Sequence, residues 1–306
     1  MTILRLLLAL ALLGVTASPA AALNVFACEP EWGALAGELG GGDVSVFTAT
    51  TARQDPHQIQ ARPALIARLR NADLVVCTGA ELEIGWMPVL LRQAANGRVQ
   101  PGLPGYFAAA EQVRLVDVPI RLDRSEGDVH AAGNPHIQTD PRNVRAVAVV
   151  LARRLAELDP GRSAAYAERS AAFLAKLDAA IARWQRTAAP LNGVRIVAYH
   201  KDWTYLLAWL GMEEVATIEP KPGVPPGSAY LAQLLDDIPR KETKMILHAA
   251  YQEARPAQFV GEKSGLPVVL LPFTVGGTDG AADLLGLYED TIARLLAALE
   301  KSGARR

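Results

Sequence analysis

The chain is poor in cysteine, with only Cys28 and Cys77 among its 306 residues. Neither cysteine has the spacing of a metal-binding pair. In an oxidising compartment the two could form a disulfide, and otherwise they are two small buried thiols; the sequence leaves both readings open. A lipid anchor needs a cysteine directly after a signal sequence, whereas Cys28 falls inside a predicted strand. The sequence therefore predicts a protein without a lipid anchor.

Long hydrophobic runs and an excess of one charge are also lacking. After residue 22 there is no stretch of about 20 uninterrupted apolar residues, which predicts a soluble mature chain. The 31 basic and 32 acidic residues nearly cancel, and loss of Arg5 with a signal sequence leaves 30 against 32, a net charge near −2. This balance argues against nucleic acid or an acidic membrane surface as the main partner. No internal repeat is evident.

The first 22 residues have the order of a secretory signal. Arg5 precedes the apolar run Leu6–Val15, and small residues follow at Ala20, Ala21 and Ala22. The run is too short to span a bilayer, and we expect cleavage after Ala22. Export without an anchor suggests a bacterial periplasm.

Short apolar strands then alternate with helical segments, which is typical of an α/β fold with mainly parallel sheets. The alternation occurs twice and predicts two lobes with a cleft between them. The strands expected in the first lobe are Asn24–Cys28, Val44–Thr48, Asp73–Cys77 and Val113–Val118, and those in the second are Arg195–Tyr199, Glu214–Ile218, Lys244–His248 and Val268–Leu271. We divide the chain into a signal peptide (1–22), an N-terminal lobe (23–141), a helical segment (142–190) and a C-terminal lobe (191–306).

The helical segment contains two predicted helix starts. Asp140 and Asp159 each precede a proline, an arrangement in which the carboxylate caps the helix and proline takes its first position. The second helix is expected to run from Pro160 to Thr187, about 42 Å. Its apolar residues recur at helical spacing, so one face is packed. A helix of this length could be an ordinary core helix, but its position favours a rigid spine that joins the two lobes.

Four potential metal ligands, His57, His136, His200 and Asp279, each follow a predicted strand. In open α/β sheets, ligands bind beyond the carboxyl ends of the strands, so these four residues could converge on one point. Each lobe would supply two of them. Singly, each could be an ordinary loop residue, but together three imidazoles and a carboxylate make a closed tetrahedral zinc site.

The segments around these residues carry a family resemblance. They are Asp55-Pro56-His57, Asn134-Pro135-His136 with Asp140-Pro141, Tyr199-His200 with Trp203, Ile218-Glu219-Pro220, and Gly276-Gly277-Thr278-Asp279. From Leu23 onward the chain resembles the solute-binding proteins of bacterial zinc and manganese ABC importers, the cluster A-I group. The resemblance implies two pseudo-symmetric lobes joined by one long helix, with the metal between the lobes. It also implies that His57, His136, His200 and Asp279 hold the ion.

The resemblance further implies capture of a metal ion and its delivery to a membrane permease, without enzymatic activity. Members that bind manganese generally have a carboxylate where this chain has His200, and imidazole suits zinc, so Zn²⁺ is the expected cargo. We expect a monomer and, as a second partner, a periplasmic metallochaperone. The loop Arg121–Gly133 has one histidine, His130, where many zinc importers have several. His130 either captures incoming metal or is an ordinary solvated residue.

Two other functions stay open at this stage. A zinc hydrolase would use three histidines and an open position for water, but it needs a general base, and no HExxH motif is present. A binding protein of the same architecture could instead carry manganese or a chelated metal. His248, which also ends a predicted strand, is expected to pack or to hydrogen-bond near the site rather than to bind the ion. Glu219 is expected to orient a ligand or to satisfy backbone donors.

Overall fold

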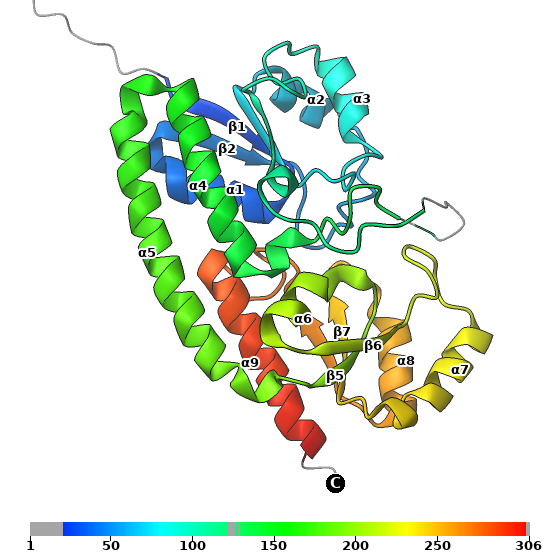
Figure 1. Ribbon diagram of the computed structural model, residues 1–306. Helices are drawn as coiled ribbons and strands as arrows, with labels where there is room; N and C mark the ends of the chain where they lie inside the picture. Colours follow the sequence, from blue (N-terminus) through cyan, green and yellow to red (C-terminus); the bar gives the residue numbers. More distant parts are fainter. Residues whose placement is uncertain (1–20, 122–126, 128, 304–306) are drawn as a thin grey trace, which may run out of the picture.

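The computed structural model describes residues 21–121, 127 and 129–303. Nearly all of the predicted signal sequence lies outside this part of the chain. Two four-stranded parallel sheets occupy the upper and lower halves of the molecule (Figure 1). Their strands are β1 (Leu23–Ala27), β2 (Val44–Thr48), β3 (Leu74–Cys77), β4 (Tyr106–Ala108), β5 (Arg195–Ala198), β6 (Glu213–Thr217), β7 (Met245–Ala249) and β8 (Val268–Leu271).

Both sheets have the same strand order. The first is ordered β2-β1-β3-β4 and the second β6-β5-β7-β8, so in each the first strand of the lobe pairs with the second and third. All pairings are parallel. Parallel strands need crossover connections on the faces of the sheet, and the helices of each lobe provide them. The predicted α/β fold with two equivalent lobes is confirmed.

The fourth strand is not where the sequence predicts it. β4 consists of Tyr106–Ala108, which pairs with the end of β3. The prediction of a strand at Val113–Val118 is wrong, because these residues form no strand. The apolar alternation of residues 113–118 resembles that of a strand, but Val116 and Val118 are exposed. Phe107 of β4 is buried, so burial in the core, more than alternation, decided which segment joined the sheet.

Helices cover the sheets (Figure 1). Three of them begin with proline at the first helical position, where the missing N–H costs no hydrogen bond. The helices are α1 (Pro30–Gly40), α2 (Pro63–Arg70), α3 (Met87–Ala94), α4 (Pro141–Leu158), α5 (Ser163–Thr187), α6 (Thr204–Leu210), α7 (Ser228–Asp237), α8 (Ala254–Ser264) and α9 (Leu284–Gly303). No helix in the described part of the chain is long and apolar enough to cross a membrane.

Helix α5 passes along both lobes, as the spine prediction requires (Figure 1). It begins at Ser163 rather than Pro160, because residues 160–162 form a separate 3-10 turn. Of the two predicted capping carboxylates, Asp140 accepts a hydrogen bond from the Arg142 backbone N–H and caps α4. Asp159 instead binds the side chains of Arg162 and Tyr166. The boundaries of our division of the chain into lobes stay a prediction.

One hydrophobic core runs through both lobes. It includes Val25 and Leu74 of the first sheet, Ile196 and Leu247 of the second, and buried side chains of α5. At the C-terminal lobe, the Trp184 ring of α5 lies against Trp209 of α6 and Tyr288 of α9, with ring centroids 6.3 Å and 5.3 Å away. A continuous core resists wide hinge movement of one lobe against the other.

Cys28 and Cys77 form a disulfide, which decides the alternative that the sequence leaves open. The two residues lie at the ends of the neighbouring strands β1 and β3, and their Cα atoms are 4.8 Å apart. This distance is within the range that a disulfide spans. Both cysteines are fully buried, so the bond is a structural link between the strands that lead toward the site.

A buried carboxylate joins the lobes near this disulfide. Glu31 of α1 accepts a hydrogen bond from the hydroxyl of Thr274, which follows β8. Burial raises the pKa of Glu31 to about 7, although the bond from Thr274 acts in the opposite direction. Because the ordinary value is 4.5, the folded protein keeps a proton between about pH 4.5 and 7 that the unfolded chain has lost. Stability therefore falls as pH rises through this window.

We expect Glu31→Gln to remove this pH dependence. The metal-free variant should match the unaltered protein at pH 5 to within about 1 kcal/mol and exceed its free energy of unfolding by about 1 to 3 kcal/mol at pH 8. Urea unfolding at the two pH values measures the difference. Glu38→Gln, on the exposed face of the same helix, is the control and should show no such change. An equal effect of Glu31→Gln at both pH values would contradict the assignment.

Candidate metal centre

Three of the four predicted ligands meet between the lobes. His57 follows β2, His136 lies ahead of α4, and His200 follows β5. One side-chain nitrogen from each lies within 4.8 Å of the others. The ring centroids are 5.6 Å apart for His57 and His136, 5.9 Å for His57 and His200, and 5.5 Å for His136 and His200. The fold thus brings residues as far apart in the chain as His57 and His200, 143 positions, to one point.

Two of these histidines are set by the same local motif. In Asp55-Pro56-His57, the Asp55 carboxylate accepts from the backbone N–H of His57 and lies 2.7 Å from its ring Nδ1. In Asn134-Pro135-His136, the side-chain Oδ1 of Asn134 accepts from the backbone N–H of His136 and lies 2.9 Å from its ring Nδ1. The proline between them fixes its own φ, which reduces the freedom of each loop. The sequence prediction gave Asp55 and Asn134 no separate role, although their identical spacing to a histidine is the signal for one.

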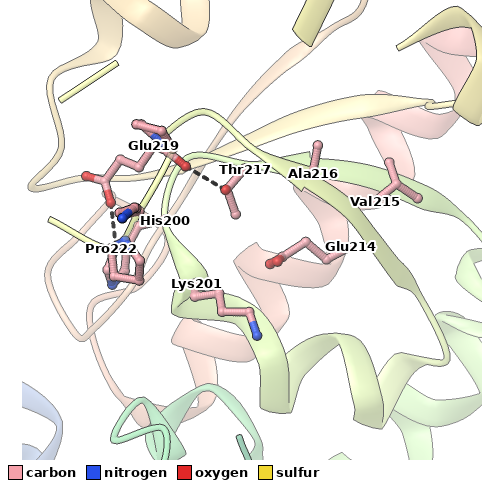
Figure 2. A pocket seen from close by; sticks show the side chains of 10 residues that line it. His200, Lys201, Glu214, Val215, Ala216, Thr217, Glu219 and Pro222 are labelled. Carbon is pink, nitrogen blue, oxygen red and sulfur yellow. Dashed lines mark hydrogen bonds and ion pairs between the residues drawn. The ribbon is translucent and has the colours of Figure 1, made fainter. Parts of the chain in front are cut away.

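The third histidine is oriented in the same way by a more distant residue. The Nδ1 of His200 lies 2.7 Å from the Glu219 carboxylate, and Figure 2 shows the two side chains together at one cavity. All three histidines therefore have Nδ1 engaged, which leaves Nε2 for a ligand. A carboxylate or carbonyl on the far nitrogen is the usual partner of a metal-binding histidine. The expectation that Glu219 orients a ligand matches this contact, and Glu219 also accepts from the Gly223 backbone N–H.

The Nε2 atoms of His57 and His136 are buried and have no hydrogen-bond partner among the described residues. Burying a polar nitrogen without a partner costs free energy of about 1 to 3 kcal/mol. A metal ion bound by these nitrogens would remove that cost. The centre therefore has the properties of a site built for an ion rather than those of an ordinary histidine cluster.

The pKa values of His136 and His200 are shifted in opposite directions. Burial and the neighbouring imidazoles hold the pKa of His136 well below its usual range, so this ring is neutral. For His200 burial acts in the same direction, but nearby carboxylates, Asp202 first, outweigh it and raise its pKa to about 9. A metal ion binds neutral imidazole, so it must displace a proton from His200 at neutral pH. Proton competition with the metal at His200 therefore extends above the ordinary histidine range near pH 6.5.

Asp279 does not join the three histidines in this structure. It is exposed in the turn after β8 and lies outside the group whose ligand atoms converge. The turn is held toward α9, because the Thr278 hydroxyl donates to Asp290 at 2.5 Å. A bond from the Gly276 N–H to the Ala281 carbonyl closes it. Asp279 as a fourth ligand stays a prediction, and it requires this turn to move.

Asp202, a residue that the sequence prediction overlooked, brings a carboxylate closer. It is fully buried, and its Oδ1 lies 3.8 Å from the Nε2 of His136. Both of its oxygens are already hydrogen-bonded, one to the Tyr251 hydroxyl and the other to the Gln252 amide. Asp202 therefore supplies negative charge beside the imidazoles while its own position is fixed.

Two cavities meet at His200. One, of about 270 Å³, lies over β6 and is lined by His200, Lys201, Glu214 and Glu219 among others (Figure 2). The other, of about 180 Å³, is lined by His130, Asn134, His136 and His200 among others. His136 and His200 thus border hollow, partly polar space through which a small ion can reach them.

The remaining predicted residues fall into two groups. His248 is buried at the end of β7 but does not belong to the converging histidines. Trp203 is buried and its ring packs edge-on against Phe273, which in turn lies 5.5 Å from the ring of His136. Trp203 therefore supports the centre by packing, through Phe273. His130, by contrast, lies at the centre, with its ring centroid 5.3 Å from that of His57.

The chain belongs to the family described as the periplasmic component A of zinc-uptake complexes, the ZnuA family, whose model matches residues 25–301. The resemblance inferred from the sequence is thereby confirmed. The description is that of a metal-binding component of an uptake system in the periplasm, and it names no catalytic activity. Metal binding and a periplasmic location follow from family membership, whereas cleavage after Ala22 stays a prediction.

Individual relatives cover most of the chain at low identity. The high-affinity zinc uptake protein ZnuA of Paracoccus denitrificans is 25% identical over 273 residues, 78% of each chain. The manganese ABC transporter substrate-binding lipoprotein scaA of Streptococcus gordonii is 26% identical over 167 residues, which are 54% of this chain and 51% of that protein. Relatives with either metal in their names therefore share this sequence pattern.

Solved structures share the fold. A crystal structure of ZnuA superimposes with a TM-score of 0.74 at 22% identity and covers 90% of this chain and 99% of that one. A manganese-bound periplasmic metal-binding protein from Candidatus Liberibacter asiaticus gives 0.72 at 18% identity, with 90% and 98% covered. At these identities the likeness establishes the two-lobed architecture and leaves the metal to be argued from the residues.

Proposed function

We propose that this protein captures Zn²⁺ in the periplasm and delivers it to the permease of an ABC importer. The observation that carries the proposal is the convergence of His57, His136 and His200, each with its Nδ1 held by an acceptor. Imidazole nitrogen suits Zn²⁺, whereas Mn²⁺ prefers carboxylate and carbonyl oxygens. The ion is the cargo, so tight binding must be followed by release.

Delivery follows from the family and from the rigid fold. The continuous core and the spine helix α5 limit closure of the lobes, so release depends on local movement of the loops that carry the ligands. Docking of both lobes on the permease would disturb these loops. A monomeric state and a periplasmic metallochaperone remain parts of this proposal, and the family description supports the transporter as partner.

The test is a metal titration of the unaltered protein against a fluorescent chelator. We expect one tightly bound Zn²⁺ per chain and at least about 100-fold weaker binding of Mn²⁺, because the donors are nitrogens. Metal removal with a chelator and reloading should restore the same stoichiometry. Tighter binding of Mn²⁺ than of Zn²⁺ would contradict the proposed cargo.

A zinc hydrolase is the second candidate, because three histidines without a carboxylate ligand are the usual ligand set of catalytic zinc. Such an enzyme needs a free general base beside the bound water. The carboxylates of Asp55 and Glu219 are engaged by the Nδ1 atoms of His57 and His200, and the oxygens of Asp202 are taken by Tyr251 and Gln252. Zinc-loaded protein should therefore show no turnover of ester, peptide or phosphate substrates, and metal-dependent turnover would favour the enzyme.

A further inference from the structure

A fourth imidazole lies at the metal centre. His130 is half-buried, and its ring centroid is 5.3 Å from that of His57 and 6.3 Å from that of His136. Its Nε2 is buried and has no hydrogen-bond partner among the described residues, as is true of the Nε2 atoms of His57 and His136. Three unpartnered imidazole nitrogens in one place point to a common ligand.

These ring separations fit one ion. With Zn–N bonds of about 2.0 to 2.1 Å, the centre of an imidazole lies about 3.2 Å from a bound zinc, and four tetrahedral rings then have centres about 5 Å apart. The three histidines described above are 5.5 to 5.9 Å apart. His130 lies 5.3 Å from His57 and 6.3 Å from His136, and it stands just outside the group of three whose ligand nitrogens already lie within 4.8 Å of one another. Coordination by all four rings therefore requires His130 to move inward.

The chain holds His130 by a turn with unusual backbone conformation. Gly79, Ala80 and Glu81, which follow β3, all have positive φ, at 78°, 49° and 68°. Two successive non-glycine residues in this region are strained, and such strain persists only where the surroundings enforce it. The turn is enforced at its base, where the Glu83 carboxylate accepts from the backbone N–H groups of Thr78 and Gly79 at 2.8 Å and 3.0 Å.

The strained turn contacts His130 and its neighbour directly. The Ala80 backbone lies beside the His130 imidazole and acts to raise its pKa, against the larger effect of burial, which lowers it to about 4. The Glu81 carboxylate accepts from the backbone N–H of Ala131 at 2.6 Å. The turn 79–81 therefore holds the backbone next to His130 in place, through the bond between Glu81 and Ala131.

We infer that His130 is the fourth ligand of the ion, through Nε2, and that Glu81 is a positioning residue that holds it there. The inference deepens the proposed function and rests on it. It replaces the predicted ligand Asp279, which is exposed and tied toward α9 by Thr278 and Asp290. The site would then consist of four imidazoles, a neutral donor set that suits Zn²⁺ over Mn²⁺.

Zinc affinity of His130→Ala and Asp279→Ala, measured with the fluorescent chelator, tests this assignment. We expect His130→Ala to weaken binding at least about 10-fold, as loss of even an orienting residue does, and Asp279→Ala to change it less than about threefold. Zinc X-ray absorption should count four imidazoles in the unaltered protein and in Asp279→Ala, and three in His130→Ala. The reverse result would be weaker zinc binding by Asp279→Ala and unchanged zinc binding by His130→Ala. It would overturn the inference while leaving the proposed function intact.

Glu81 is tested by a conservative pair. Glu81→Ala should weaken zinc binding by about 10-fold, and Glu81→Gln, whose amide oxygen can still accept from Ala131, should restore most of it. Loss of one imidazole from the absorption spectrum in Glu81→Ala is a readout that mere destabilisation would not give. Four imidazoles and unchanged affinity in Glu81→Ala would remove Glu81 from the assignment. Failure of the unaltered protein to bind zinc at all would instead reject the proposed function.

Discussion

His136→Ala should reduce zinc affinity by more than about 100-fold. His136 is the most deeply buried of the three converging imidazoles, at 2% exposed, and its ring faces both His57 and His200. Removing a residue that only orients a ligand typically costs 10- to 100-fold in affinity, so removing a ligand should cost more. The cavity left by alanine can hold a water in place of the nitrogen, but water binds zinc less tightly.

Competition with a fluorescent chelator measures this loss, and heat denaturation gives an independent reading. Bound zinc stabilises the native state according to its concentration relative to the Kd, so excess zinc should raise the Tm of the unaltered protein. The rise should nearly vanish in His136→Ala. His248→Ala is the matched control, because His248 is buried at a strand end but lies outside the centre. Retention of affinity within tenfold in His136→Ala would contradict the assignment of this ligand.

Trp184→Ala should lower the free energy of unfolding by about 3 to 5 kcal/mol, the usual cost of deleting a large buried aromatic. Trp184 is 3% exposed and joins α5 to α6 and α9 through the rings of Trp209 and Tyr288. Its removal leaves a cavity where the spine helix meets the C-terminal lobe. The effect should therefore appear as loss of stability and as looser attachment of the lobe.

Urea unfolding of the metal-free protein measures the change. Lys176→Ala, at an exposed position of the same helix, is the control and should alter stability by less than about 0.5 kcal/mol. Because one core spans both lobes, we expect a single cooperative transition in the unaltered protein. A loss below about 1 kcal/mol in Trp184→Ala would show that the spine is not anchored by these rings.

Much of the architecture could be predicted because it depends on local pattern. Short apolar runs that alternate with amphipathic helices predict parallel sheets, and seven of the eight strands lie within a residue or so of their predicted positions. The failure at β4 has a physical cause. Val113–Val118 has the alternation of a strand, but pairing with β3 went to Tyr106–Ala108, whose Phe107 fills the core.

The residues of the metal centre could likewise be predicted from the sequence only in part. His57 and His200 could be predicted to converge because each follows a strand, and the carboxyl ends of parallel strands lie at one edge of a sheet. His136 also reaches this point, although the strand predicted before it is absent and it lies ahead of α4. The residues that orient them were partly visible in the sequence, as the shared Asp-Pro-His and Asn-Pro-His spacing. Asp202 was not, because its proximity to His136 depends on how the segment after β5 folds back.

The sequence alone determined most of the periodic features of this protein: seven of the eight strands, the long helix between the lobes, and the loops after β2 and β5 that carry His57 and His200. Tertiary structure alone decided which side chains beyond these two reach the centre. Asp279 lies exposed in a turn where Thr278 binds Asp290, and the ring of His130, beside the strained turn 79–81, lies 5.3 Å from that of His57. Such contacts join segments far apart in the chain, so no local pattern of residues records them.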